Sequence, residues 1–408
     1  MACSASGAGA SGPERTAPAI LAYDPSDPAF HADPYPLYAR LREEAPLHRS
    51  RGDAPAWVVT RYADCLEVLR RPDAGFAFGF DPHPGVQGVG HRSLARRAAL
   101  HSEVRRLVSR AVTPWTVQRL RPAAERRVAC LLEAIRGRDL VELMGEVAEP
   151  VAVALVCELL EVPAGDRARF REWAPDLAAA LVSGTPNRCA RPDAVRRACA
   201  DYLARRVEED ERKPAGGLLT RLADAEEGAR RMSRAERVTT SMQLAVASYV
   251  MARGLIGNLC LALLQHREAL AAIRSDPSSV PYAVDECLRW DPPLQLGLRV
   301  ALESFELRGQ EIRAGQGVWL LIGAAHRDGR VFLEPDRFDP LRAGPPHLVR
   351  GFGGPFGIGA EVARLGAEVV ADGLFRRIPR LVLAGDRLDR RRSAFFRSPE
   401  RLPVAIAV

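Results

Sequence analysis

The chain has 408 residues, of which 47% are hydrophobic and 27% charged. This balance excludes a disordered or fibrous protein and allows one or two globular domains. The formal net charge is +7, but the arginines are scattered among acidic residues, without the basic stripe and interleaved aromatics that nucleic-acid binding favours. The eight cysteines are widely spaced and form no CxxC pair, so we expect reduced thiols and no metal site.

The chain opens with a small, polar stretch, MACSASGAGASGPERTAP. It lacks the apolar core of a signal peptide and has the composition of a disordered segment. We therefore expect residues 1–24 to be a disordered tail and residues 25–408 to form a single domain. The protein is expected to be cytoplasmic.

Helical periodicity dominates the first two thirds of the chain. Leu37 and Leu41 lie at helical spacing, residues 57–60 alternate like a strand, and nearly every segment from about 100 to 265 has a 3.6-residue period broken by proline and glycine. The longest apolar stretch begins at Leu244 and carries an arginine near its middle. A buried core helix explains that stretch better than a membrane span.

The pattern changes between Arg299 and Leu320. Short strand-like pieces are separated there by Arg-Gly and Ala-Gly turns, and a second strand-like patch closes the chain. The sequence therefore predicts a mainly α protein with a small β region.

Three motifs follow one another in the C-terminal part. In AVDECLRW, Glu286 and Arg289 stand three residues apart, so on a helix they share a face and can pair, although such pairs contribute only about 0.2–0.5 kcal/mol on a solvated helix. The stretch GAAHRDGRVFLEPDRFDPLR contains Arg337. HLVRG then leads into the glycine-rich run GFGGPFGIGA at 351–360. That run resembles a phosphate loop, but no Lys-Ser/Thr follows, which disfavours nucleotide binding.

In this order and spacing the motifs resemble those of the cytochrome P450 family, and of its soluble bacterial members in particular. The resemblance extends over residues 25–408 and implies the P450 fold. It implies that Glu286, Arg289 and Arg337 form a structural charged network. It also implies four positions that hold haem propionates in the family, or that serve as inherited salt bridges here: His101, Arg105, Arg299 and His347.

The position of the iron ligand departs from the family. There the ligating cysteine lies ten residues after the histidine of HLxxG, and counting from His347 places Gly357 at that position. No Cys, His, Met or Tyr occurs between Arg350 and Ala367, so the loop and the first turns after it offer no substitute. In thiolate enzymes the cysteine anchors the iron and favours O–O cleavage, and glycine can do neither.

The sequence also departs from the family pattern on the opposite side of the expected haem site, where oxygen binds in the family. Residues 247–251, ASYVM, resemble the family's oxygen-binding helix, where an A-G-x-acid-Thr segment delivers protons. Val250 stands at the acid position and cannot relay a proton. Met251 stands at the threonine position and offers only a weak acceptor. We therefore do not expect a functional monooxygenase.

These departures lead to the expectation that the chain carries no cofactor, although the propionate positions leave haem binding open. P450 homologues without haem act as auxiliary partners of deoxysugar glycosyltransferases in antibiotic biosynthesis, and this chain resembles them. We expect an activating partner of a glycosyltransferase or another biosynthetic enzyme, with room for a small-molecule ligand in the cavity. No membrane or nucleic-acid partner is expected.

Two alternatives stay open. The first is a haem-independent enzyme that uses the old cavity for acid–base chemistry on a polyketide- or peptide-like substrate, with Tyr249 as the first candidate catalytic residue. The second is a haem oxidoreductase with unusual ligation.

Overall fold

The computed structural model describes residues 23–24, 28–50, 55–71, 74–76, 103–104, 106–182, 190–350, 355–378, 380–385, 388–393 and 395–406. The α-helices are α1 (Pro28–Ala32), α2 (Tyr35–Glu44), α3 (Tyr62–Arg70), α5 (Pro114–Gln118), α6 (Arg121–Ala134), α7 (Glu149–Leu159), α8 (Arg167–Val182), α9 (Ala190–Arg212), α10 (Leu218–Asp224), α11 (Arg234–Gln265), α12 (Arg267–Ser275), α13 (Val280–Trp290), α14 (Ile322–Ala325) and α15 (Pro355–Arg377). The π-helix η1 (Met144–Ala148) and the 3₁₀ turns η2 (Ala164–Asp166), η3 (Pro277–Ser279) and η4 (Leu348–Arg350) complete the helical elements.

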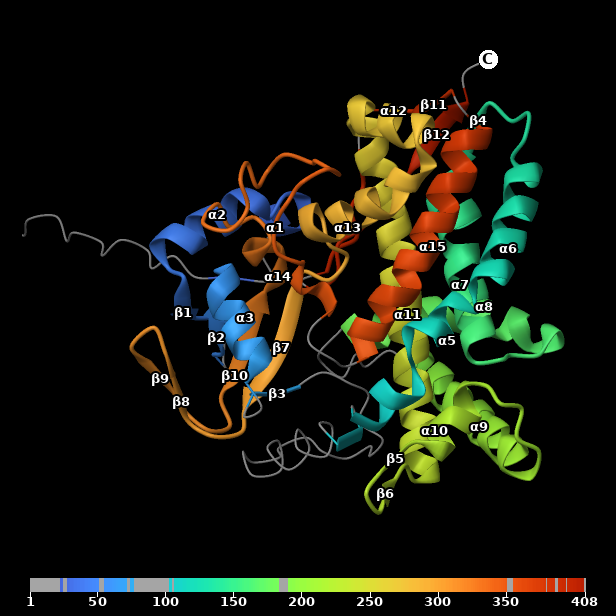
Figure 1. The fold of residues 1–408 in the computed structure, drawn as a ribbon, viewed down its shortest axis with the longest axis horizontal. Helices are drawn as coiled ribbons and strands as arrows, with labels where there is room; N and C mark the ends of the chain where they lie inside the picture. The colour runs from blue at the N-terminus through green and yellow to red at the C-terminus, as the bar shows by residue number, and fades with distance from the viewer. Residues whose placement is uncertain are drawn as a thin grey trace, which may run out of the picture.

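The strands are short: β1 (Leu47–Arg49), β2 (Trp57–Val59), β3 (Ala74–Phe76), β4 (Leu140–Glu142), β5 (Glu226–Glu227), β6 (Arg230–Arg231), β7 (Leu296–Ala301), β8 (Phe305–Leu307), β9 (Gln310–Ile312), β10 (Gly317–Leu321), β11 (Leu381–Leu383) and β12 (Pro403–Ile406). Figure 1 shows a large helical body beside a smaller β region. The predicted mainly α architecture is confirmed.

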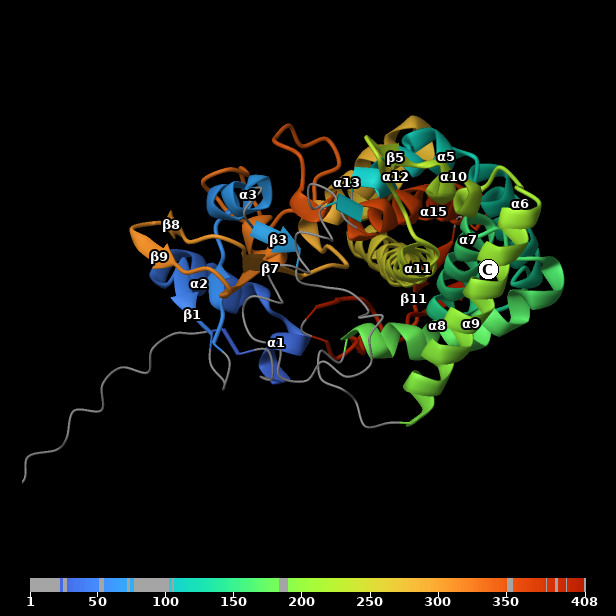
Figure 2. The same cartoon turned by 90° about the horizontal axis from the view of Figure 1, so that it is seen from below.

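The long helix α11 forms the centre of the helical body. It begins with a capping box in which the Ser233 hydroxyl accepts from the Glu236 amide at 3.3 Å and the Glu236 carboxylate accepts from the Ser233 amide at 2.8 Å. The helix packs most extensively against α15, α7 and α9. Figure 2 looks nearly along its axis, with α15 and α7 beside it. Its central residues therefore have no exposed face.

α11 is the one helix in the described part of the chain that is long and apolar enough to cross a membrane. Its whole apolar window is buried inside the fold. The expectation of a core helix at this stretch is confirmed. The neighbouring helices remove the apolar surface of α11 from water, so a membrane is not needed to cover it.

The largest sheet has five strands in the order β1-β2-β10-β7-β3, with β2 and β10 parallel and the other pairs antiparallel. The order β11-β12-β4 makes a second sheet that ties the C-terminal strands to the chain before α7. The small hairpin β8–β9 turns at Arg308 and Gly309, whose φ angles are +53° and +73°. Positive φ values at both central residues give a two-residue hairpin turn whose twist matches that of the flanking strands. Glycine adopts a positive φ readily, which explains why the sequence has Arg-Gly at this turn.

The C-terminus of α7 carries a non-glycine residue in the left-handed region. The Val162 amide donates to the Cys157 carbonyl at 2.7 Å and the Glu161 amide donates to the Glu158 carbonyl at 3.2 Å, which is the Schellman pattern. Glu161 occupies the position that glycine normally takes, with φ +52°.

We expect Glu161→Gly to unfold at higher denaturant concentration than Glu161→Ala. Both variants lose the same carboxylate, but only glycine adopts a positive φ without steric cost, so the difference in unfolding free energy should be about 1 kcal/mol. Chemical denaturation of the two variants measures it. Equal midpoints would show that the left-handed conformation at this residue carries no strain.

Candidate functional site

The first turn of α15 crosses α11 at Gly359. A Cβ atom at Gly359 would lie 2.9 Å from the carbonyl carbon and oxygen of Ala247 and 3.2 Å from the amide nitrogen of Ser248. These atoms belong to the backbone of a buried helix and cannot give way as a flexible side chain would, so the crossing requires glycine. Gly357 lies two residues earlier in the same turn. The position without an iron ligand is therefore next to the α11–α15 crossing.

The side chains of α11 near this crossing are buried. Val250 is 4% exposed, and Met251 and Ser248 are fully buried. The Ser248 hydroxyl has no hydrogen-bond partner among the described residues. Val250 and Met251 provide no group that relays protons, as the sequence indicates, whereas the sequence reasoning overlooked Ser248, a hydroxyl where the family pattern has glycine.

Tyr249 lies among apolar side chains of neighbouring helices. It is 3% exposed and lines a small apolar pocket with Val153 and Val156 of α7 and Phe170 and Leu177 of α8. Burial, and then the charge of Glu149, raise the pKa of its phenol above the ordinary value. A phenol with a raised pKa in an apolar pocket is not equipped to act as a base at neutral pH.

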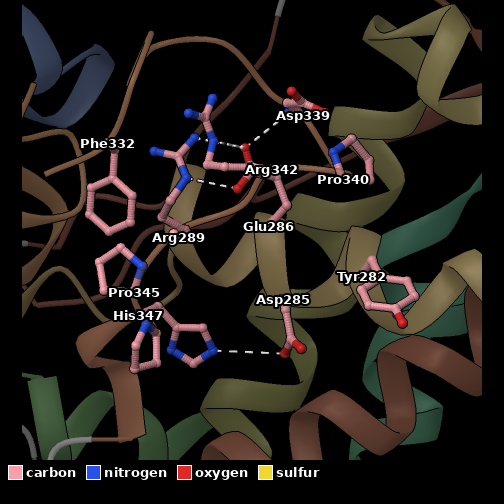
Figure 3. Close-up of a pocket in the computed structure, with 12 residues that line it drawn as sticks. Tyr282, Asp285, Glu286, Arg289, Phe332, Asp339, Pro340, Arg342, Pro345 and His347 are labelled. Atoms are coloured by element: carbon pink, nitrogen blue, oxygen red, sulfur yellow. Dashed lines mark hydrogen bonds and ion pairs between the residues drawn. The ribbon is translucent and has the colours of Figure 1, made fainter.

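A buried charged network lies on α13 (Figure 3). The Arg289 guanidinium donates to both Glu286 carboxylate oxygens, at 2.7 and 2.8 Å, and the two side chains are 4% and 5% exposed. Arg289 also donates to the carbonyls of His326 and Pro335 at 2.8 Å and of Arg337 at 3.0 Å. These bonds satisfy the guanidinium fully, so the pair joins α13 to the segment that follows α14.

The second arginine of this network is Arg342, which corrects the prediction of Arg337. Arg342 Nε lies 3.3 Å from Glu286 Oε1, and its guanidinium also donates to backbone carbonyls of the surrounding loop. The side chain of Arg337 is 59% exposed and pairs only with the exposed Glu334 among the described residues. Arg337 contributes its carbonyl instead, which accepts from Arg289 and Arg342. Both arginines belong to the stretch PDRFDPLR, and spacing alone could not choose between them.

Below this network lies His347, beside a pocket of about 250 Å³. The side chain of His347 is 7% exposed, and its Nε2 atom lies 3.8 Å from Asp285 Oδ1. Asp285 in turn accepts two hydrogen bonds of 2.9 Å from Arg364 of α15. Burial raises the pKa of Asp285, but its interactions with His347 and Arg364 outweigh burial and lower it. The sequence reasoning missed Asp285 and Arg364, although Asp285 directly precedes Glu286.

A second buried histidine supports the turn that carries His347. His326 is fully buried, and its Nε2 accepts a hydrogen bond from the Leu348 amide at 2.6 Å. Burial, and then the neighbouring His347, hold the pKa of His326 well below the ordinary value. A neutral ring that accepts at Nε2 carries its proton on Nδ1. His326 therefore fixes the backbone one residue after His347.

Arg299 lies on β7 and is 5% exposed. His347 Nδ1 is buried and has no hydrogen-bond partner among the described residues. His101 and Arg105, the other two positions expected at haem propionates, lie outside the described residues. Among the positions expected from the family, the described residues thus include a glycine at the ligand position, a buried arginine on β7, and a buried histidine that lies beside Asp285 near the charged network of α13.

A family model, curated protein sequences and solved structures all show that this chain is similar to cytochrome P450 proteins. The family model "Cytochrome P450" matches residues 275–348. The protein "Cytochrome P450 107B1" of Saccharopolyspora erythraea is 35% identical over 405 residues, which cover 95% of this chain and 98% of that protein. The structure of the bacillaene polyketide synthase cytochrome P450 PksS of Bacillus subtilis 168 has a TM-score of 0.83 at 30% identity and covers 95% of this chain and all of that one. P450BioI, solved in complex with an acyl carrier protein loaded with hexadec-9Z-enoic acid, has a TM-score of 0.81 at 30% identity and covers 93% and 99% of the two chains.

These similarities correct the expectation that the chain carries no cofactor. Relatives this similar over almost their whole length are haem proteins, so they point to haem and the prediction is wrong. At the carboxylate end, the described residues include groups whose chemistry suits a haem: Arg299 is buried on β7, and the buried Nδ1 atom of His347 lacks a hydrogen-bond partner among the described residues. The iron end does not fit the family's thiolate ligation, because Gly357 has no side chain.

Proposed function

The chain belongs to the cytochrome P450 family, and from this premise we propose that it serves a bacterial biosynthetic pathway by binding another biosynthetic enzyme, and not as a monooxygenase. The observation that carries the proposal is Gly357 in the first turn of α15. A thiolate-ligated haem supplies the electron-rich iron on which the family's oxygen chemistry depends. This chain offers no thiolate at that place.

The surroundings of α11 support the same proposal. The buried Val250 and Met251 carry no group that can deliver a proton. Properly placed proton-transfer groups contribute roughly 10²–10⁴-fold to the rates of reactions that need them. A chain that lacks both the thiolate and the relay has lost two independent requirements of oxygenation while keeping its buried scaffold.

The residues that remain are suited to holding a group in place. Arg299 and His347 would hold the two carboxylates of a haem, and Glu286, Arg289 and Arg342 would keep the loops near it in position. In this proposal haem stabilises the fold, and the surface of the folded chain binds the partner enzyme.

We propose a deoxysugar glycosyltransferase as the partner, since the P450-like auxiliary proteins that the chain resembles act on such enzymes. The complex of P450BioI with an acyl carrier protein supports the idea that this fold can dock another protein of a biosynthetic pathway. We also propose that residues 25–408 are a single domain that works in the cytoplasm.

Co-expression with a deoxysugar glycosyltransferase from the same gene cluster tests the proposal. We expect the two chains to co-purify and the transferase to melt at a higher temperature, because a partner at 100 times its dissociation constant stabilises the folded state by about 2.7 kcal/mol. A cysteine-containing P450 from the same organism serves as the control. Separate elution on gel filtration, with equal glycosyl transfer with and without this chain, would refute the proposal and favour a haem oxidoreductase with unusual ligation.

A further inference from the structure

The pocket of about 250 Å³ beside His347 lies between α13 and the segment that follows α14 (Figure 3). Tyr282 lines it on the side of α13, and Pro340, Pro345 and Pro346 line it on the side of the segment. Pockets that bind whole small molecules usually have volumes of about 300–1,000 Å³. This pocket is therefore better suited to one long side chain.

The ionised side chains that line the pocket carry a net negative charge. Three are the carboxylates of Asp285, Glu286 and Asp339, and two are the guanidiniums of Arg289 and Arg342. One negative charge is left when histidine is counted as neutral, whereas the whole chain, counted in the same way, has a net charge of +7. The pocket is therefore an acidic feature of a basic protein, and it is complementary to a cationic group.

Two of the three carboxylates already have guanidinium partners. Glu286 is held by Arg289 at both oxygens, and Asp285 accepts two hydrogen bonds from Arg364. At Asp339, one oxygen accepts from the backbone amide two residues later at 3.0 Å, and the carboxylate forms no ion pair with the residues that the structure describes. Asp339 is therefore the carboxylate that can take an incoming cation.

Exposed apolar side chains flank the pocket. Among the described residues six large hydrophobic side chains are exposed, and three of these are Tyr282, Leu333 and Leu341, at 61%, 83% and 80%. Leu333 directly follows Phe332 and Leu341 directly follows Pro340, and both of the preceding residues line the pocket. A small cation would leave the two leucines in water, whereas the face of a second protein would cover them.

We propose that this pocket is the docking site for the partner enzyme and that it receives an arginine side chain of that enzyme. The inference rests on the proposed function, which supplies the partner. A guanidinium can pair with the Asp339 carboxylate and stack on the exposed ring of Tyr282. Arginine and tyrosine are also among the residues that dominate binding energy at protein interfaces.

Titrations of the full-length protein test the pocket without the partner. The probes are ethylguanidinium, which is the end of an arginine side chain, and its neutral analogue N-ethylurea, at constant ionic strength. The protein carries 3-fluorotyrosine at its seven tyrosines, and the fluorine signal that Tyr282→Phe removes reports on the pocket. We expect ethylguanidinium to shift this signal with a dissociation constant of about 1–10 mM, and N-ethylurea to bind at least about tenfold more weakly. Equal binding of the two compounds, or no shift with ethylguanidinium, would overturn the inference.

Variants connect the pocket to the partner. In calorimetric titrations with the glycosyltransferase, Tyr282→Ala and Asp339→Asn should each raise the dissociation constant of the complex roughly 10-fold or more. The matched controls are Leu140→Ala on β4, at a side chain that is 57% exposed, and Glu311→Gln on β9, at one that is 62% exposed. Both controls should leave the dissociation constant unchanged.

The outcomes distinguish this inference from the proposed function. Pocket variants that bind the transferase as tightly as the controls would overturn the inference and leave the proposed function standing. A wild-type chain that forms no complex would refute the proposed function, and the ethylguanidinium titration would still decide whether the pocket takes an arginine. A dimer of this chain on gel filtration that Asp339→Asn dissociates would show that the arginine comes from a second copy, which also overturns docking of the partner enzyme here.

Discussion

Arg289→Met is expected to lower the free energy of unfolding by about 3–5 kcal/mol, the range found when one partner of a buried ion pair is removed. The substitution leaves the Glu286 carboxylate, 5% exposed, without its two-point partner. It also leaves the carbonyls of His326, Pro335 and Arg337 without the donor that joins them to α13. Methionine fills a similar volume, so lost packing contributes little.

Arg337→Met is the matched control for this measurement. Its side chain is 59% exposed and pairs only with another exposed side chain among the described residues, so we expect a change within about 0.5 kcal/mol. Arg342→Met should fall between the two, at about 1–3 kcal/mol, because Glu286 keeps Arg289. Urea denaturation of the three variants gives the order. If Arg337→Met lowered the free energy of unfolding as much as Arg289→Met does, Arg337 would belong to the network as the sequence predicts.

Gly357→Cys is expected to change the spectrum of haem-loaded, reduced protein qualitatively. With carbon monoxide, the variant should show the thiolate difference band that gives the family its name, and the wild type should show none, because cysteine at this position supplies the thiolate that glycine lacks. Ile358→Cys is the control. It places a thiol one residue further along α15, about 100° around the helix, where it should not ligate the same iron.

The same variant separates ligation from proton delivery. Val250 and Met251 remain apolar in Gly357→Cys, so oxygen-dependent turnover should stay roughly 10²–10⁴-fold below that of a triple variant that also carries Val250→Asp and Met251→Thr. Hydroxylation of a macrolide or fatty-acid probe with a redox partner provides the measurement. Equal turnover in the single and triple variants would show that the apolar residues of α11 do not limit the chemistry.

Features determined by local residue type could be predicted from the sequence. Apolar periodicity predicted the central helix that contains Leu244, because a buried helix needs apolar residues at helical spacing. The Arg-Gly pair predicted the β8–β9 turn, because glycine readily adopts the positive φ that the turn requires. The motif order from Glu286 to His347 was sufficient to recognise the family. The glycine at position 357 needs no coordinates, because a residue type without a side chain cannot provide a ligand in any conformation. The step from that glycine to an absent cofactor went wrong because it took iron ligation for the whole of haem binding.

Contacts between distant segments were decided only by the tertiary structure. Arg337 and Arg342 are both arginines of one loop, and the path of that loop over α13 directs the second to Glu286 and the first to solvent. Tyr249 was expected on a cavity-lining helix, but its rotation about the α11 axis directs it to α7 and α8. A motif specifies which groups are present, but helix rotation, loop path and side-chain rotamer decide which of them meet, and these depend on packing across the whole chain.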